Sequence, residues 1–232
     1  NVYKLTFEKF LTLKKYLISF LKYYIKKKKL KIADISLGNI LISSLFLKNN
    51  KNFNKSLEEI HFFLDLKNNV YNVTTGENLY LLAILENGEI VLDEEKLVNI
   101  KHKYRVQDIF LVKKKLTKKK LNLISKKNKK FKLNYLNKIN KHPNLNPKVA
   151  HRLLNSDIII YGPGTQYSSL FPSYLTKDIR EIIIKSKAKK FLITNIFLDN
   201  DIYKENVESI IRKFNFFFNK NKKKEINNNK FV

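Results

Sequence analysis

The chain has 232 residues, 44% of them hydrophobic, and a formal net charge of +27 at pH 7. This length and apolar content predict a single globular domain over residues 1–232 and exclude a disordered chain. The absence of cysteine excludes disulfides and thiolate chemistry, and it is typical of a cytoplasmic protein. The longest uncharged apolar run, residues 35–47, is shorter than the roughly 20 residues of a membrane span, so we expect no membrane partner.

The positive charge is concentrated in three segments. Residues 22–31 hold six lysines, residues 113–142 hold 13 lysines and no acidic residue, and residues 219–230 carry a net charge of +4. The chain has 43 lysines and four arginines, whereas specific base recognition favours the arginine fork. We therefore interpret these segments as solvated and low in complexity, and we do not expect nucleic-acid binding. A basic RNA-binding module is the alternative.

Helices are predicted in the N-terminal third. Apolar residues at helical spacing predict a long helix over residues 5–25. Residues 36–39 read Ser-Leu-Gly-Asn and precede an apolar run. There Gly38 permits a close approach, and Asn39 is a candidate either for binding a sugar hydroxyl or for capping a helix. Ser56 and Glu59 have the spacing of a capping box, which predicts the start of another helix.

Strands and a lysine-rich segment follow. Residues 79–85 and 89–92 flank an Asn87-Gly88 turn, which is a strong hairpin signal because both residues tolerate positive φ. Residues 104–112 form a further strand candidate. Residues 113–142 are predicted to be a peripheral low-complexity insertion. The alternative is that its apolar residues seat part of it on the body of the protein: Leu116, Leu121, Leu123, Ile124 and Phe131. Asn146 and Pro147 then predict a helix over residues 147–154, as its N-cap and first residue.

A strand–loop–helix–strand pattern organises the C-terminal part. Residues 158–161 read as a buried strand, residues 178–186 as a helix and residues 191–196 as a second strand. Such a βαβ unit pairs its strands in parallel. The predicted fold class is therefore α/β, with a Rossmann-like, mainly parallel sheet covered by helices and an appended β-hairpin. An amphipathic helix over residues 207–217 and a basic surface stretch over residues 219–232 complete the chain.

The loop over residues 162–169 is the candidate ligand site. It leaves the carboxyl end of a strand, where open α/β sheets bind their ligands. Its two glycines permit close backbone approach, and its hydroxyls and the N–H groups of the following helical turn can bind phosphate. The alternative is a tight turn that uses glycine only for its dihedrals. The four histidines are isolated, so no metal site is predicted.

The sequence GPGTQYSSLFP at residues 162–172 resembles the loop of the 2-phospho-L-lactate transferase (CofD) family, which also includes the gluconeogenesis factor (YvcK) proteins. Members carry GP-x₅-S-x₂-P after a strand, and Gly162, Pro163, Ser169 and Pro172 fall on this pattern. The Ser-Leu-Gly-Asn motif and the Asn-Gly hairpin match in the same order. The resemblance therefore runs from about residue 30 to about residue 200.

This resemblance implies a nucleotide diphosphate ligand, either a UDP-sugar or a GDP-linked group, at the carboxyl edge of the sheet. The transferase branch passes a phospholactyl or enolpyruvyl-phosphate group from a guanosine diphosphate carrier to a deazaflavin alcohol. The gluconeogenesis-factor branch binds UDP-sugars and acts in carbon metabolism and cell shape. The implied nucleotide- and phosphate-binding residues are Gly38, Asn39, Gly162, Pro163, Gly164, Thr165, Ser168 and Ser169.

Two positions favour the gluconeogenesis-factor branch. Gly164 matches its GPG sequence, and Ile40 stands where the deazaflavin transferases carry an arginine. Isoleucine offers neither charge nor hydrogen bond, so we do not expect deazaflavin phospholactyl transfer. A 2-phospho-L-lactate transferase-type enzyme and a non-enzymatic nucleotide-sugar-binding regulator both stay open.

The chain contains no methionine, and it lacks the glycine-rich strand–loop and the Asp-Asp-Gly-Gly segment with which the resembled family begins. We therefore expect a fragment that is incomplete at both ends. The acidic metal-binding groups of the family lie in that opening segment. No cofactor is assigned to this chain, and Mg²⁺ is expected only for the full-length protein.

Overall fold

The computed structural model describes residues 6–26, 35–92, 96–97, 104–195, 202 and 205–220. The chain divides into two compact units, residues 1–72 and residues 73–232, where the sequence predicts a single domain. Each unit is described by itself. The predicted basic surface stretch lies outside the described residues from position 221 onward.

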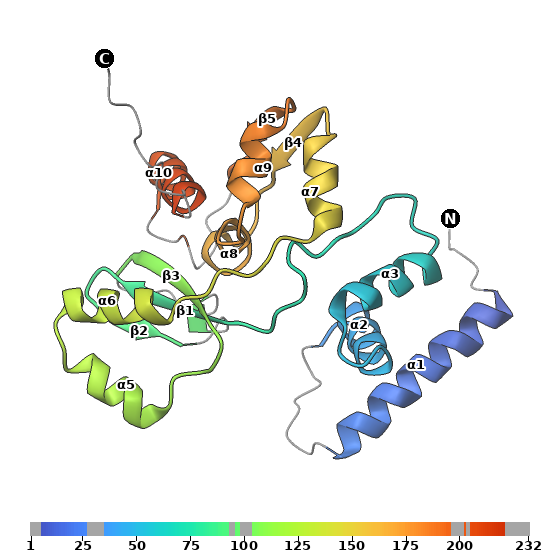
Figure 1. Ribbon diagram of the computed structural model, residues 1–232. Helices are drawn as coiled ribbons and strands as arrows, with labels where there is room; N and C mark the ends of the chain where they lie inside the picture. The colour runs from blue at the N-terminus through green and yellow to red at the C-terminus, as the bar shows by residue number, and fades with distance from the viewer. Residues whose placement is uncertain are drawn as a thin grey trace. The chain divides into compact units, whose positions relative to one another are not determined.

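The first unit is built from helices (Figure 1). They are α1 (Phe7–Lys26), α2 (Leu37–Lys48) and α3 (Phe53–Phe63). Helix α2 packs against both α1 and α3, and Tyr16, Leu41 and Leu45 form the buried core between them. The long N-terminal helix predicted from the apolar spacing is confirmed as α1.

A polar cluster around Glu59 ties these helices together. Its carboxylate accepts hydrogen bonds from the Tyr16 hydroxyl and the Asn49 side-chain amide, both at 2.8 Å, and it pairs with Lys48. Burial by itself raises the pKa of Glu59, but the hydrogen bonds from Lys48, Asn49 and Tyr16 outweigh burial and lower this pKa. The carboxylate therefore stays ionised while it links α1, α3 and the end of α2.

Helix α3 begins earlier than the sequence predicts. Asn52 is its N-cap, with a side chain that accepts a hydrogen bond from the Lys55 N–H at 3.0 Å. Ser56 lies inside the helix, where it is buried and donates to the Asn52 carbonyl oxygen at 2.7 Å. The capping box predicted at Ser56 and Glu59 is therefore wrong, because Asn52 is an equally good capping residue one turn upstream.

The second unit contains an antiparallel sheet of three strands in the order β2-β1-β3. The strands are β1 (Tyr80–Leu85), β2 (Ile90–Val91) and β3 (Val106–Val112). The predicted hairpin is confirmed, since Ala83 lies opposite Val91 and Gly88 adopts a φ of +83°. The strand predicted over residues 104–112 is confirmed as β3.

Part of residues 113–142 packs on one face of this sheet, which corrects the expectation of a peripheral insertion. They form the helices α5 (Lys118–Ser125) and α6 (Lys129–Ile139). Leu136 of α6 is fully buried in a cluster with four sheet residues: Leu82, Ile84, Phe110 and Val112. The many lysines obscure an apolar stripe at helical spacing, and burial of that stripe against the sheet outweighs the composition.

Elements from the C-terminal part pack on the other face of the sheet. They are the π-helical turn η1 (Gln166–Leu170), α8 (Phe171–Tyr174) and α10 (Val207–Asn219). Their fully buried side chains form one cluster with residues of β1 and β3: Tyr167, Phe171, Leu175 and Phe217 pack with Ala83, Leu85, Ile109 and Leu111. The three-stranded sheet therefore lies between two covering layers, and the predicted amphipathic helix over residues 207–217 is confirmed as α10.

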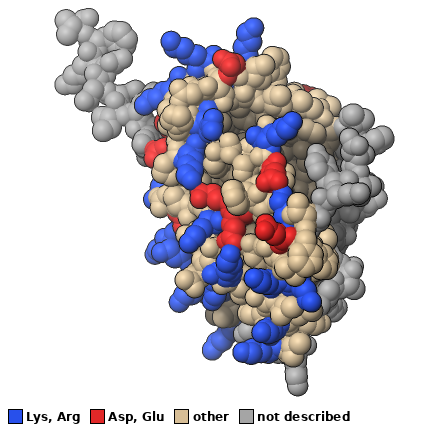
Figure 2. All heavy atoms as spheres, turned by 90° about the vertical axis from the view of Figure 1, so that its right-hand side faces the viewer, with Lys and Arg blue, Asp and Glu red and all other residues tan. Residues whose placement is uncertain are grey.

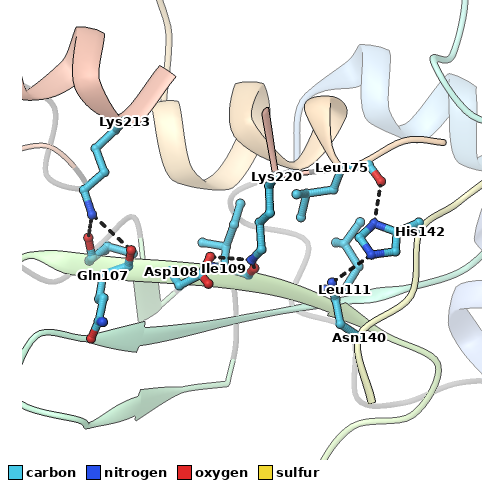
Figure 3. A network of polar contacts seen from close by, with 10 residues as sticks. Gln107, Asp108, Ile109, Leu111, Asn140, His142, Leu175, Lys213 and Lys220 are labelled. Carbon is cyan, nitrogen blue, oxygen red and sulfur yellow. Dashed lines mark hydrogen bonds and ion pairs between the residues drawn. The ribbon is translucent and has the colours of Figure 1, made fainter. Parts of the chain in front are cut away.

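Two lysines attach α10 to β3 (Figure 3). The Lys213 ammonium donates to two carbonyl oxygens at the start of β3, at 2.8 and 3.0 Å. The Lys220 ammonium donates to the Ile109 carbonyl oxygen at 2.9 Å and pairs with the Asp108 carboxylate. Burial is the main cause of the lowered pKa of both lysines. Their long side chains thus satisfy three backbone oxygens of β3.

The predicted βαβ unit is confirmed as β4 (Ile158–Tyr161), α9 (Ile179–Lys185) and β5 (Lys189–Leu192), which lie beside α7 (Pro147–Leu154) in Figure 1. Strand β5 begins and ends earlier than the strand predicted over residues 191–196, and residue 196 lies outside the described residues. The two strands pair in parallel, and Asn146 caps α7 as predicted. Strand β4 is not buried on both faces, however: Ile158 is 54% exposed and Ile160 is 59% exposed. Alternate residues of a strand face opposite sides, and among the described residues only the side of Ile159 is covered.

The α/β class is confirmed. The described strands pair as one antiparallel and one parallel sheet, where the sequence predicts one mainly parallel sheet with an added hairpin. The tight Asn87-Gly88 turn requires antiparallel pairing of β1 with β2, and β3 joins the free edge of β1. Among the helices in the described ranges, none combines the length and the hydropathy that a membrane span requires.

Candidate functional site

The candidate loop joins β4 directly to a helical segment. Gly162 and Pro163 leave the carboxyl end of β4, Thr165 precedes η1, and η1 continues into α8 without a break. Strand β5 ends nearby at Leu192 and is followed by Asn195. Because β4 and β5 are parallel, their carboxyl ends lie at the same edge, and the loop meets Asn195 there.

The backbone of Gly164 is held by side-chain amides. Its N–H donates to Asn195 Oδ1 at 3.2 Å, and Asn195 Nδ2 donates to its carbonyl oxygen at 3.0 Å. Buried Gln166 donates from Nε2 to the same Asn195 oxygen at 3.0 Å and to the Gly164 carbonyl oxygen at 3.2 Å. The Gly164 N–H is therefore already engaged, and these bonds hold the loop in one path.

Sequence reasoning missed Gln166 and Asn195. One signal was present, because Asn195 follows the second strand of the βαβ unit and so belongs to the same sheet edge as the loop. For Gln166 we find no such signal, since its burial depends on the packing of η1.

Three hydroxyls of the loop lie together. Thr165 Oγ1 lies 2.7 Å from Ser169 Oγ, and Ser168 Oγ lies 3.5 Å from the same atom, at the outer limit of a hydrogen bond. Three hydroxyls carry three protons, and these two contacts use no more than two of them. At least one proton is therefore left to donate to a bound anion.

The space beside both loop glycines is open. A Cβ atom added to Gly162 or to Gly164 meets no heavy atom within 4 Å. Gly164 has a φ of +151°, a conformation that other residues rarely adopt. The φ of Gly162 lies outside this unusual region. Backbone geometry thus explains glycine at position 164, while an approaching ligand is one physical reason for glycine at position 162.

The loop rests on a rigid aromatic base. Tyr167 and Phe171 are each 1% exposed, and their rings meet edge to face with centroids 5.1 Å apart. Phe217 of α10 stacks on Phe171 at 4.7 Å, and the Tyr167 hydroxyl donates to Glu205 at 2.8 Å. One side of η1 is therefore fixed in the core, while Ser169 on the same turn is exposed.

The Ser-Leu-Gly-Asn motif lies in the first unit, at the start of α2. Ser36 is the N-cap, and its hydroxyl accepts a hydrogen bond from the Asn39 N–H at 3.2 Å. Ser36, and not Asn39, therefore caps α2, so the capping role predicted for Asn39 is wrong. A Cβ on Gly38 would lie 3.9 Å from Ser36 Oγ, an ordinary contact, so packing within the described residues does not require glycine there. Ile40 is half-buried.

His142 and His151, the described histidines of the second unit, belong to no metal-binding group of described residues. His142 donates from Nδ1 to the Leu175 carbonyl oxygen at 3.0 Å, and its Nε2 lies 3.3 Å from the Asn140 side-chain nitrogen (Figure 3). It thus links the end of α6 to the end of α8. In the described ranges, no group of three or more histidine, cysteine, aspartate or glutamate side chains is placed to hold a metal ion.

The sequence model of the family described as 2-phospho-L-lactate transferase CofD matches residues 6–223. The chain belongs to this family. The resemblance noted in the loop, the Ser-Leu-Gly-Asn motif and the hairpin is thereby confirmed over nearly the whole chain.

Relatives of this CofD-family chain carry the name of a gluconeogenesis factor. A protein of Aquifex aeolicus named "Putative gluconeogenesis factor" is 24% identical over 160 residues, which is 68% of this chain and 40% of that protein. A protein of the same name from Thermotoga maritima is 27% identical over 161 residues, or 69% and 41% of the two chains. The CofD-family chain therefore spans about two fifths of the length of these relatives.

A solved structure shows the same fold. The crystal structure of a UPF0052 family member from Bacillus halodurans matches with a TM-score of 0.58 and 20% sequence identity. The match covers 78% of this chain and 49% of that one. At this identity the likeness bears on the fold alone.

Proposed function

We propose that this CofD-family chain binds a nucleotide diphosphate ligand at the loop over residues 162–169, with the diphosphate against the backbone at Gly162. The observation that carries the proposal is the open space beside both loop glycines at the carboxyl edge of a parallel strand pair. A UDP-sugar is the first ligand to test, because the matched relatives are named for the gluconeogenesis-factor branch.

The loop can hold phosphate without a positive side chain. The first N–H groups of a helical segment have no acceptor within the helix, and they point toward a ligand at its start. The hydroxyls of Thr165, Ser168 and Ser169 add at least one further donor. The hydrogen bonds from Asn195 and Gln166 hold the loop in place before a ligand arrives, which reduces the entropy cost of binding.

A 2-phospho-L-lactate transferase-type enzyme is the second candidate, and the description of the matching family favours it. The metal-assisted chemistry of such an enzyme needs acidic ligands. The described residues do not fit a Mg²⁺ ion, since they contain no group of acidic and histidine side chains placed to hold one. We therefore derive no catalytic step, and binding is the function proposed for this chain.

The RNA-binding alternative has less support. On the face shown in Figure 2, Lys and Arg side chains are interleaved with Asp and Glu and with uncharged residues. Nucleic-acid backbones are bound largely by clusters of Lys and Arg side chains on one face.

Calorimetric titration of the chain with a UDP-sugar and with GDP tests the proposal. Gly162→Val places a side chain in the open space without straining the backbone, and Ser125→Val in exposed α5 is the matched control. We expect Gly162→Val to weaken binding by about tenfold or more, with an unchanged melting temperature, because its side chain occupies the space of the phosphate. Equal affinity in Gly162→Val and the control would overturn the proposal.

A further inference from the structure

A second hollow lies between the connection that follows β3 and helix α6, and it shares no residue with the loop over residues 162–169. Its volume is about 680 Å³, within the range of pockets that hold small molecules. Among the described residues that line it, none is acidic. Six of them are lysines: Lys113, Lys114, Lys115, Lys120, Lys138 and Lys141.

Four of these ammonium groups have no partner among the described residues. Within the part of the chain that the structure describes, the side chains of Lys113, Lys114, Lys138 and Lys141 make no hydrogen bond and no ion pair. Cations around one concave surface repel each other and raise the local concentration of anions. A bound anion would remove this repulsion.

The wall between these lysines is apolar and includes one unsatisfied polar group. Val112 and Ile139 line it together with Tyr135, whose ring lies beneath the Lys120 ammonium at 5.3 Å. The Tyr135 hydroxyl oxygen is buried and has no hydrogen-bond partner among the described residues.

We propose that this hollow binds a small molecule that carries two or more phosphate groups. Lysine ammonium groups bind phosphate as point charges, and several of them around one site match the charge of a diphosphate or triphosphate. The apolar wall accommodates an attached ring or chain. The ligand class is therefore a polyphosphorylated small molecule, for which inorganic tripolyphosphate and ATP are the probes.

The surroundings of the hollow favour a small molecule over a nucleic acid. A neighbouring hollow shares Lys113, Lys114 and Lys141 but also contains Glu77. Burial alone raises the pKa of Glu77, but hydrogen bonds, first among them that from the Asn144 N–H at 2.7 Å, outweigh burial and lower this pKa. The carboxylate is therefore ionised and interrupts the basic surface, whereas a nucleic-acid strand needs a continuous basic groove.

The test compares two double variants that each remove two charges from the same lysine-rich segment. Lys114→Gln with Lys138→Gln alters the hollow, and Lys118→Gln with Lys119→Gln alters exposed lysines of α5 that do not line it. Tripolyphosphate and ATP are titrated calorimetrically into the native chain and both variants at one ionic strength. Circular dichroism checks that the helices are retained.

We expect saturable binding to the native chain, a loss of about tenfold or more in the first variant, and a loss of about twofold or less in the second. Absence of binding to the native chain would overturn the proposal. So would equal losses in the two variants, which would indicate diffuse attraction by net charge. Tighter binding of a 20-nucleotide oligouridylate than of tripolyphosphate, reduced equally in both variants, would identify a nucleic-acid surface instead.

Discussion

Leu136→Ala in α6 tests whether the lysine-rich segment belongs to the core. The Leu136 side chain is 0% exposed and packs with residues of β1 and β3. Removing its outer carbons loses the transfer free energy of those atoms and leaves a cavity, and such leucine substitutions cost about 2–5 kcal/mol of unfolding free energy.

Two contacts of α6 set the expected loss of unfolding free energy near the middle of this range. Lys129 and Lys132 of α6 donate to the carbonyl oxygens of Glu86 and Gly88 at 2.7 and 2.9 Å, which hold the helix to the hairpin. These contacts limit how far α6 can move into the cavity, so we expect a loss of about 3 kcal/mol.

Urea unfolding followed by circular dichroism and tyrosine fluorescence measures this loss. Phe131→Ala on the same helix is the matched control, because Phe131 is 47% exposed and we expect it to cost about 1 kcal/mol or less. If Leu136→Ala costs no more than Phe131→Ala, α6 is not part of the core and residues 113–142 are peripheral after all.

Three further predictions follow from the structure. The pKa of Glu59 is lowered from its ordinary value of 4.5, so its stabilising contribution is present above pH 4.5 and is lost as the pH falls through the lower folded value. The stability gap between the native chain and Glu59→Gln should therefore narrow on acidification in urea titrations, and a gap that is constant with pH would contradict this. Gly164→Ala should lower the unfolding free energy by about 1–3 kcal/mol, because alanine is strained at a φ of +151°. Gly162→Ala should lower it by about 0.5 kcal/mol or less. Equal falls in melting temperature for the two variants would show that no strain is involved. Lys220→Met should lower the unfolding free energy by about 3 kcal/mol, because it leaves Asp108 buried without its cation. Adding Asp108→Asn to this variant should recover part of that loss in urea unfolding, and no recovery would contradict the prediction.

Local signals in the sequence predicted the elements that depend on backbone conformation. Asn87-Gly88 and Asn146-Pro147 set φ angles and capping bonds within a few residues, and the hairpin and α7 form where these signals lie. The parallel pairing of β4 and β5 was predictable for a similar reason, because a strand, a helix and a strand in short succession favour this arrangement.

Tertiary packing explains what sequence reasoning missed. The buried position of Leu136 depends on a sheet face formed by residues 24 or more positions upstream, and the lysines around it made the segment look solvated. The candidate loop was predicted from its own residues, yet its support by Gln166 and Asn195 depends on the pairing of two strand ends. Composition and short motifs carry no direct information on such contacts.

Hydrogen exchange with and without a UDP-sugar tests the proposed binding site most directly, because amide N–H groups are the donors that the loop offers to phosphate. We predict slower exchange in peptides that cover residues 162–171 when the ligand is present, with no change in peptides that cover α5. Saturable binding with protection confined to other parts of the chain, or no protection at any ligand concentration, would contradict it.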